Sequence, residues 1–499
     1  MRRSVFILAM VLSLKTIAQD DHLRRMETVY PIMDSIFAQQ AAEKHFPGLS
    51  YGLVVDGKLV HTFNMGETEI GAHVPVTRNS AFRIASMTKS FTAMAILRLR
   101  DEGKLKLDDP VSKYIPEMKG VKPLTKDAPE VTVRHLLMHG AGFPEDNPWG
   151  DRQMAKDDAS MLAMIRKGIS FSNSPGITYE YSNMGFAMLG YIIRKVSGIY
   201  YADYIKKYIL LPLGMTHTEL EIDRVPKKDL AHGYRWLDGK WVEQPMLHDG
   251  TYGAMGGMIT TMEDFSKYVA FHLSAWPPSD AVETGPVKRS SVREMHFPWN
   301  NSGFNPNFKY ASGRACPTVT AYCYGLRWMR DCEDRVLIGH TGGLPGFGSN
   351  WNILPAYGIG IISFINLTYA PAAAMNLRAL DTLIRTADLK PRALEPSKIL
   401  QQRRDELMRV LPDWNNAEAS GIFAENFFLD YFPDALRKEA KPMFDDIGKV
   451  VKVHPVVPEN DLRGEFIVEG ERGKLAVRFT LTPENPPLIQ EYHIRSLDR

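Results

Sequence analysis

Cysteine is scarce in this chain of 499 residues, which contains only Cys316, Cys323 and Cys332. A scaffold held together mainly by disulfides is excluded, because such scaffolds are short and rich in cysteine. The odd number leaves at least one thiol unpaired. A bridge between Cys316 and Cys323 would close a small loop, but spacing alone does not assign the pairing. No histidine stands at ligand spacing among the cysteines, so we expect no metal and no other cofactor.

The chain also lacks a surplus of charge of either sign. Its 60 Lys and Arg residues face 58 Asp and Glu residues, which gives a formal net charge of +2. Because no block of basic residues of useful length appears, nucleic acid is not an expected partner. Beyond the first residues, no apolar stretch is long enough to cross a bilayer, so we expect no membrane span. The composition, 44% hydrophobic and 24% charged, is that of a globular protein.

The amino terminus is typical of a secretory signal peptide. Two arginines precede an apolar run over residues 5–14, and small residues at positions 16 and 18 favour cleavage before Gln19. The run is too short to span a membrane, and no nearby cysteine could carry a lipid anchor. The sequence therefore predicts a signal peptide over residues 1–18 and an exported mature protein, either periplasmic or secreted.

The order of patterns predicts a first domain over residues 19–388. Alternating apolar residues flank Asp56 and Gly57, which predicts a β-hairpin, and strand patterns return only after Tyr322. Helical patterns dominate between these regions. Strands at both ends with helices between them predict one antiparallel sheet built from both chain ends, a helical lobe beside it, and a cleft where the two meet.

A second, smaller domain is expected at the carboxyl end. Residues 389–396 are predicted to be a linker, because they contain two prolines and no periodic pattern. Residues 397–499 then show a charged helix, an aromatic-rich helical stretch and about four strand-like runs. This order predicts a small α+β domain, similar to the nuclear-transport-factor-2-like folds, with the aromatic row packed in its core.

The four residues from Ser86 to Lys89 form an S-x-x-K motif that opens a helical run. A serine and a lysine three residues apart share one face of a helix. The helix dipole favours an alkoxide developing on the serine. The lysine amine can accept the serine proton if burial or a cationic neighbour lowers its pKa. Alone, this pattern recurs by chance in long proteins.

Two further motifs follow in order. Tyr181 and Asn183 form a Y-x-N triplet before a helical run, and an H-T-G triplet, His340 to Gly342, comes at the end of a predicted strand. The three motifs together resemble those of the serine β-lactamase and penicillin-binding protein superfamily. The Y-x-N form resembles the class C branch, which includes D-Ala-D-Ala carboxypeptidases, esterases and D-aminopeptidases. The resemblance extends to the segments 105–110, 133–143 and 256–265, and it covers roughly residues 25–388.

The resemblance implies an α/β (α+β) fold of the β-lactamase/transpeptidase type, with two lobes: an antiparallel sheet flanked by helices and an all-helical lobe. It implies that Ser86 attacks a carbonyl carbon and forms an acyl-enzyme. Lys89 would hold or relay the serine proton, and Tyr181 would act with Lys89 as general base and then as acid toward the leaving group. The remaining implied site residues are Asn183, His340, Thr341 and Gly342 for substrate binding, and the backbone N–H groups of Ser86 and Gly343 for the oxyanion hole.

One departure from the family pattern concerns the charge near the substrate. β-Lactamases usually carry lysine where this chain has His340, and a mostly neutral imidazole weakens the fixed positive charge. We therefore do not expect efficient β-lactamase activity. The expected function is an exported serine hydrolase that cleaves an amide or ester of a small molecule or peptide, of carboxypeptidase, D-aminopeptidase, esterase or weak β-lactamase type. The alternative is a catalytically silent binding or scaffold protein, against which the intact motif residues argue.

Several other residues have weaker assignments. The two histidines of the segment 133–143 are expected to pack the helical lobe, and the arginine before the serine motif is expected to brace its loop. Three more side chains could line the cleft or serve ordinary surface roles. These residues are His135, His139, Arg83, Trp149, Asp249 and Tyr252.

Overall fold

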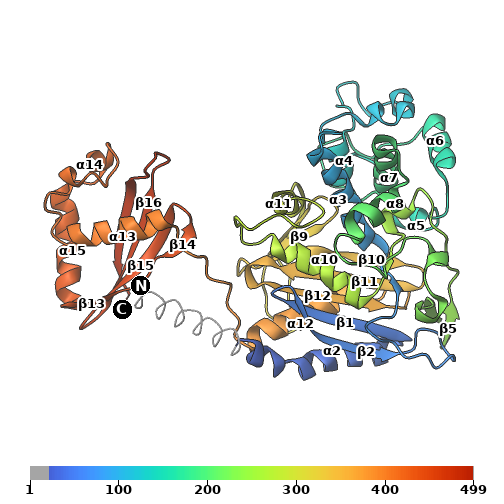
Figure 1. The fold of residues 1–499 in the computed structure, drawn as a ribbon, viewed down its shortest axis with the longest axis horizontal. Coiled ribbons are helices and arrows are strands. Elements are labelled where there is room, and N and C mark those ends of the chain that lie inside the picture. The colour runs from blue at the N-terminus through green and yellow to red at the C-terminus, as the bar shows by residue number, and fades with distance from the viewer. Residues whose placement is uncertain (1–21, 498–499) are drawn as a thin grey trace. The chain divides into compact units, whose positions relative to one another are not determined.

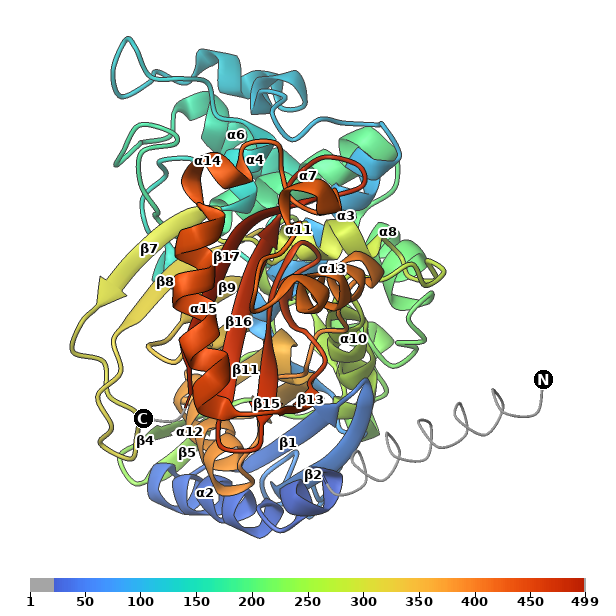
Figure 2. The same ribbon diagram turned by 90° about the vertical axis from the view of Figure 1, so that its left-hand side faces the viewer.

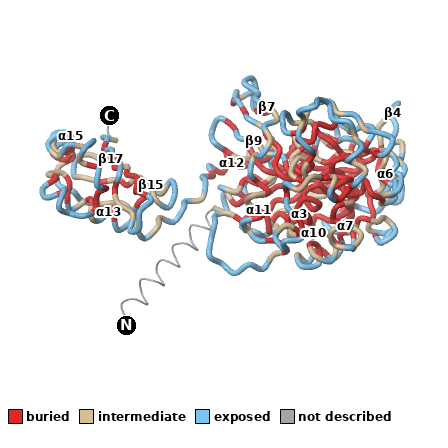
Figure 3. Tube along the Cα trace, turned by 90° about the horizontal axis from the view of Figure 1, so that it is seen from above, coloured by how far each residue is buried: buried red, intermediate tan, exposed pale blue. Residues whose placement is uncertain are grey.

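The computed structural model describes residues 22–497. The chain divides into two compact units, one ending at Pro391 and the other beginning at Arg392, inside the segment predicted to be a linker. Each unit has its own buried core, as Figure 3 shows. The predicted signal peptide lies outside the described residues. No helix among residues 22–497 combines the length and the apolar character needed to cross a membrane.

An antiparallel sheet forms the centre of the first unit (Figure 1), with the strand order β2-β1-β12-β11-β10-β9-β8-β7. Because β1 pairs with β12, the two ends of this unit meet inside one sheet, as the sequence predicts. The strands are β1 (Gly48–Val55), β2 (Lys58–Gly66), β7 (Asn300–Asn305), β8 (Thr318–Tyr322), β9 (Arg327–Arg330), β10 (Val336–Leu344), β11 (Phe347–Leu354) and β12 (Ile359–Ile365).

The first hairpin follows from its turn residues. Asp56 and Gly57 have φ angles of 49° and 80°, and a two-residue type I′ turn needs positive φ at both positions. Every residue of β1 is buried, because helices cover both faces of the sheet. The turn therefore sets the register between β2 and β1, the strand that lies next to β12.

Helices cover the two faces of the sheet separately. On one face α2 (Tyr30–Lys44) packs against α12 (Ala372–Thr386), and on the other α10 (Met262–Ser274) packs against β1 and β12. The helix α3 (Thr88–Asp101) contacts α7, α8 and α9 and so joins the sheet to the helical lobe. The remaining helices of the unit are α4 (Val133–Leu137), α5 (Asn147–Gly150), α6 (Asp158–Lys167), α7 (Asn183–Ser197), α8 (Tyr201–Ile205), α9 (Gly253–Gly256) and α11 (Arg289–Met295).

Two details differ from the sequence-based prediction. The strands β7, β8 and β9 extend the sheet on the far side of β10. The sheet therefore resumes at Asn300, well before Tyr322. The H-T-G triplet lies inside β10, which continues to Leu344, rather than at the end of a strand. Two small sheets complete the unit, β3 (Phe82–Arg83) with β6 (Ile259–Thr260) and β4 (Tyr234–Leu237) with β5 (Lys240–Glu243).

The disulfide differs from the Cys316–Cys323 pairing considered from the sequence. Cys316 and Cys332 form a disulfide, and Cys323 is a buried free thiol. The buried Cys323 thiol donates a hydrogen bond to the His296 carbonyl oxygen at 3.3 Å. The disulfide therefore joins the segment before β8 to the turn after β9.

The second unit is a small α+β domain, as the sequence predicts. Its helices α13 and α15 pack against the strands β15 and β16 (Figure 2). In the aromatic row, Phe423 and Phe427 are buried in the core, but Phe432 is exposed. The elements are α13 (Lys398–Val410), α14 (Phe427–Asp430), α15 (Pro433–Ile447), β13 (Val450–Val453), β14 (Val457–Asn460), β15 (Arg463–Gly470), β16 (Lys474–Leu481) and β17 (Ile489–Ser496).

Candidate active site

Ser86 lies in a single turn of 3-10 helix, η1 (Ala85–Met87), directly before α3. The preceding residue, Ala85, has φ 49°, a left-handed conformation that non-glycine residues seldom adopt. The Thr88 hydroxyl fixes the turn, because it donates to the Ala85 carbonyl at 2.7 Å and accepts the Met258 N–H at 3.1 Å. Such strained backbone is concentrated at functional sites. Here the strained turn holds the Ser86 side chain at the start of α3.

Lys89 is completely buried, and its ammonium group has three acceptors. Nζ lies 3.0 Å from Ser86 Oγ, 2.7 Å from Asn183 Oδ1 and 2.8 Å from the Met255 carbonyl oxygen. Burial lowers the pKa of Lys89 to about 7, although nearby carboxylates oppose the shift. A large fraction of the amine is therefore neutral near pH 7 and can accept the Ser86 proton.

Tyr181 lies beside Lys89. Ser86 lies close enough to the Tyr181 hydroxyl to affect its pKa, and Lys89 Nζ lies 4.9 Å from the centroid of the Tyr181 ring. Burial raises the pKa of Tyr181 well above its usual value. Arg327 and Ser86 lower the pKa, but they offset only part of this rise. The phenol therefore keeps its proton at neutral pH. This electrostatic environment suits Lys89 to accept the serine proton and Tyr181 to donate one, whereas the sequence-based expectation gave the two a shared role as base.

Asn183 opens α7, and its position is fixed from both sides. Asp146 accepts the Asn183 N–H on Oδ1 at 2.6 Å and the Met184 N–H on Oδ2 at 2.9 Å. The Asn183 side-chain amide donates to Asn147 Oδ1 at 3.1 Å, which leaves its own oxygen for Lys89. Asp146 thus caps the helix and positions the residue that binds Lys89. Sequence reasoning missed Asp146, because no motif marks it.

His340 lies in β10 with both ring nitrogens occupied. Nδ1 lies 2.7 Å from the Thr341 carbonyl oxygen and must donate to it, so Nε2 accepts the Tyr322 hydroxyl at 2.9 Å. Burial lowers the pKa of His340 well below its usual value, and Arg327 and Lys89 add to the effect. The ring is therefore neutral at pH 7 and has no free nitrogen for a substrate.

The glycines after His340 let β10 pass close to the segment before Ser86. A Cβ on Gly342 would lie 2.1 Å from the Ile84 carbonyl oxygen, two residues before Ser86. Ser349 of β11 donates to the same oxygen at 2.8 Å. A Cβ on Gly343 would lie 2.7 Å from the ring of Tyr369. Only glycine fits at these two positions, and the structure thereby places the predicted oxyanion strand beside η1.

Arg327, at the start of β9, supplies the cation that His340 does not. Its guanidinium carbon lies 5.5 Å from the centroid of the Tyr181 ring, and the nearby Tyr179 helps to raise the pKa of Arg327. The residue is exposed. Together with Thr341 and Asn350 it lines a cavity of about 230 Å³. No sequence motif pointed to Arg327, because it becomes part of the site only when β9 pairs with β10.

The remaining predicted residues take supporting places. Arg83 donates to the Leu247 carbonyl at 2.9 Å and so braces the segment before Ser86. His139 is buried, and its Nδ1 accepts the Ser182 N–H at 3.1 Å while its ring lies 4.2 Å from that of Tyr181. His135 accepts the Thr132 N–H at 3.2 Å in a helix cap. These residues pack and orient the lobe.

The three residues proposed to line the cleft differ in exposure. Trp149 is 41% exposed and its ring lies edge-on to that of Tyr252 at 5.7 Å. Tyr252 itself is buried. Asp249 accepts hydrogen bonds from Tyr200 at 3.3 Å and from Tyr201. Only Trp149 of the three presents a large exposed surface.

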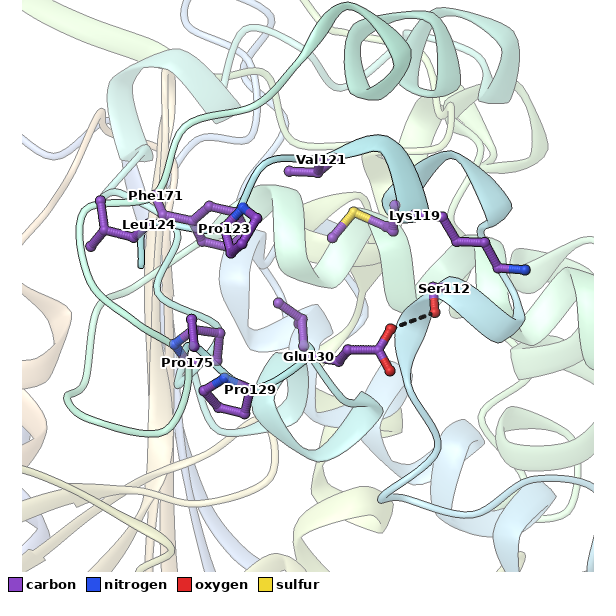
Figure 4. Close-up of a pocket in the computed structure, with 12 residues that line it drawn as sticks. Ser112, Lys119, Val121, Pro123, Leu124, Pro129, Glu130, Phe171 and Pro175 are labelled. Carbon is purple, nitrogen blue, oxygen red and sulfur yellow. Dashed lines mark hydrogen bonds between the residues drawn. The ribbon is translucent and has the colours of Figure 1, made fainter. Parts of the chain in front are cut away.

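Two other features lie outside the cluster around Ser86. Within residues 22–497, the ligand atoms of Glu221, Asp223 and His248 come within 4.8 Å of one another; Asp223 and His248 are exposed, and Glu221 is half-buried. A hollow of about 200 Å³ lies in the helical lobe (Figure 4), lined largely by prolines and apolar side chains, with the hydrogen bond from Ser112 to Glu130 at one side. Neither contains a residue of the three motifs.

A family model described as Beta-lactamase matches residues 33–384. The chain belongs to the beta-lactamase family. This confirms the superfamily inferred from the three motifs. Membership supports a serine hydrolase function in general and leaves the substrate undetermined.

Curated relatives of this beta-lactamase-family chain are distant. Protein flp of Staphylococcus aureus (strain COL) is 29% identical over 352 residues, which cover 69% of this chain and 65% of that protein. The match thus spans just under two thirds of that relative's length. Beta-lactamase-like protein 2 of Dictyostelium discoideum is 36% identical over 209 residues, covering 41% of this chain and 38% of that protein.

Solved structures confirm the fold. An octameric penicillin-binding protein homologue from Pyrococcus abyssi superimposes with a TM-score of 0.61 and 25% identity, covering 93% of this chain and 99% of that one. A class C beta-lactamase superimposes with a TM-score of 0.56 and 22% identity, covering 71% of this chain and 96% of that one. The beta-lactamase-family chain therefore has the two-lobe α/β fold predicted from its sequence.

Proposed function

We propose that this chain is an exported serine hydrolase of carboxypeptidase type, which forms an acyl-enzyme on Ser86 and releases a leaving group that carries a carboxylate. The observation that carries the proposal is the buried Lys89 amine, which lies 3.0 Å from Ser86 Oγ with its pKa lowered to about 7. A buried lysine poised in this way next to a serine is an activated nucleophile pair.

Acylation begins when Ser86 Oγ attacks the carbonyl carbon and its proton moves to Lys89 Nζ. In this mechanism the backbone N–H groups of Ser86 and Gly343 bind the developing oxyanion. Removing one donor of an oxyanion hole typically slows catalysis by about 10² to 10³. These donors belong to the backbone, so the positions of η1 and β10 matter more than any single side chain.

Breakdown of the tetrahedral intermediate requires a proton for the leaving nitrogen. Tyr181 donates its hydroxyl proton as the C–N bond breaks, and it is reprotonated by the Lys89 ammonium. The proton that left Ser86 is thereby passed on to the leaving group. In deacylation, water replaces the leaving group, and Lys89 accepts the proton of water and returns one to Ser86 Oγ. Asn183 holds Lys89 in place throughout.

The carboxylate preference comes from Arg327. Because its guanidinium lies over the Tyr181 ring, a leaving group protonated by Tyr181 emerges next to this cation. Arginine binds carboxylates through two parallel N–H donors. This geometry supports a peptidase that releases an amino acid over an esterase with a neutral leaving group.

Export to the periplasm or the medium is part of the proposal. The disulfide between Cys316 and Cys332 supports it, because disulfides persist in oxidising compartments. The expected mature amino terminus is Gln19. Amino-terminal sequencing of the protein recovered from periplasm and medium tests this point, and an unprocessed chain confined to the cytoplasm would contradict it.

Time-resolved intact mass of the purified protein mixed with a penicillin or with a peptide ending in D-Ala-D-Ala tests the chemistry. We expect a covalent adduct in the wild type and in Ser112→Ala, which changes a serine of the helical lobe, but none in Ser86→Ala. With the peptide, loss of one alanine should depend on Ser86. Release of alanine by Ser86→Ala, or the absence of both adduct and release in the wild type, would contradict the proposal.

A further inference from the structure

A hydrogen bond joins the two lobes directly above the predicted oxyanion strand. The Tyr369 hydroxyl, from the loop after β12, donates to Asp151 Oδ2 at 2.8 Å, in the turn that follows α5. Tyr369 is 53% exposed, whereas Asp151 is buried. We call this pair the Tyr369–Asp151 bridge.

The bridge is held in a defined position. Tyr369 has φ 51°, which is unusual for a residue with an aromatic side chain, and its N–H donates to the Phe347 carbonyl at 3.1 Å. Its ring lies so close to Gly343 that a Cβ there would be 2.7 Å away. The ring therefore covers the backbone whose N–H is proposed to bind the oxyanion.

The bridge and Arg327 lie at opposite ends of the same stretch of β10. Arg327 pairs with Gly339, whereas Tyr369 covers Gly343, four residues further along the strand. At about 3.3 Å per residue the two ends are about 13 Å apart. Since the leaving group departs toward Tyr181 and Arg327, the acyl part of a substrate must extend toward the bridge.

On this basis, which rests on the proposed function, we propose that the Tyr369–Asp151 bridge is the wall that limits the size of the acyl group. The ring and its bond to Asp151 close the acyl side of the site to long or branched groups. Short acyl groups fit beneath the ring, and longer ones bind only when the bridge opens. The bridge thus determines specificity without taking part in the bond-breaking steps.

The test compares kcat/KM for p-nitrophenyl acetate and p-nitrophenyl octanoate. We expect the wild type to favour the acetate by at least tenfold after correction for the uncatalysed rates. Tyr369→Ala removes the wall and should shift the ratio at least tenfold toward the octanoate. Tyr369→Phe keeps the ring but loses the bond to Asp151 and should give a smaller shift in the same direction.

The matched control is Tyr357→Ala, since Tyr357 lies in the β11–β12 turn at the other end of these strands and should leave the ratio unchanged. An unchanged ratio in Tyr369→Ala would overturn the proposal. An equal loss of activity on both esters would also overturn it, because it would assign Tyr369 a role in positioning Gly343 rather than in selecting the acyl group.

A binding measurement separates this proposal from the proposed function. In the Ser86→Ala background, calorimetry can compare N-acetyl- and N-octanoyl-D-Ala-D-Ala without any chemistry. Adding Tyr369→Ala should tighten binding of the octanoyl peptide at least tenfold and leave the acetyl peptide within twofold. Ester turnover that does not depend on Ser86 would refute the proposed function alone, whereas equal changes for the two peptides would refute the wall alone.

Discussion

The guanidinium carbon of Arg327 lies 5.5 Å from the centroid of the Tyr181 ring, and its positive charge also affects the pKa values of other residues in the site. It acts against the upward shift in the pKa of Tyr181 and adds to the downward shifts for Lys89 and His340. One exposed cation thus favours a neutral amine and a neutral imidazole near Ser86. On the proposed mechanism this arrangement suits proton transfer, because the fixed positive charge stands at the edge of the site rather than on β10.

The pH dependence of acylation follows from Lys89. The amine accepts a proton only when neutral, and burial lowers its pKa to about 7. The rate constant for acylation should therefore rise between pH 5 and pH 8, with an apparent pKa near 7, and level off above it. Stopped-flow measurement of acylation by p-nitrophenyl acetate checks this. A rate that is independent of pH across that range would show that Lys89 is not the base.

Two charge-removing substitutions should move that pKa in opposite directions. Asp151 raises the pKa of Lys89 and Arg327 lowers it. Asp151→Asn should therefore shift the acid limb to lower pH, and Arg327→Gln should shift it to higher pH. The same stopped-flow assay on the small acetate substrate serves both variants. Shifts of the same sign would indicate that a different group titrates.

Much of the first unit could be predicted from the sequence, because local patterns and global fold agree there. The Asp56-Gly57 turn, the alternation in β1 and the apolar run of β12 each carry their own signal. By contrast, β7 spans Asn300–Asn305, a polar segment with little alternation. It becomes a strand at the edge of the sheet because β8 pairs with it, and such pairing is invisible in a single sequence.

The residues of the site also fall into two groups, those that the sequence marks and those that only the fold brings together. Ser86, Lys89, Tyr181 and Asn183 carry motif spacing, so they could be named in advance, and the structure brings them together. Asp146, Arg327 and Tyr369 belong to the site only through tertiary contacts of segments far apart in the chain. The behaviour of His340 was also hidden, because its lack of charge depends on the Tyr322 bond and on complete burial.

Arg327 should affect binding of the leaving group more than the chemical step. Arg327→Gln removes a charge-assisted contact worth about 1.5 to 3 kcal/mol, which corresponds to a rise in KM of roughly 10- to 160-fold for a peptide with a free carboxyl terminus. Arg327→Lys keeps the charge but not the planar fork and should be intermediate. The amidated peptide is the control substrate, and an equal loss on both peptides would argue against carboxylate recognition.

Gly342→Ala should disable the site by moving the backbone. The added Cβ would lie 2.1 Å from the Ile84 carbonyl, so β10 and the segment before Ser86 must separate. Overpacking of this kind costs about 1–3 kcal/mol. We expect a lower melting temperature and loss of the Ser86 adduct. Gly120→Ala is the matched control, because a Cβ there meets nothing within 4 Å. Normal acylation by Gly342→Ala would show that η1 and β10 are not tightly coupled.

The disulfide should stabilise the first unit rather than take part in chemistry. Cys316 and Cys332 are separated by 16 residues, and closing a loop of that size contributes about 3 kcal/mol in the chain-entropy description. Cys332→Ser, or reduction of the wild type, should lower the melting temperature and leave the adduct at Ser86 unchanged in the folded protein. Cys323→Ser is the control, since that thiol is unpaired. Peptide mapping under non-reducing conditions decides the connectivity, and a Cys316–Cys323 link would contradict the structure of this region.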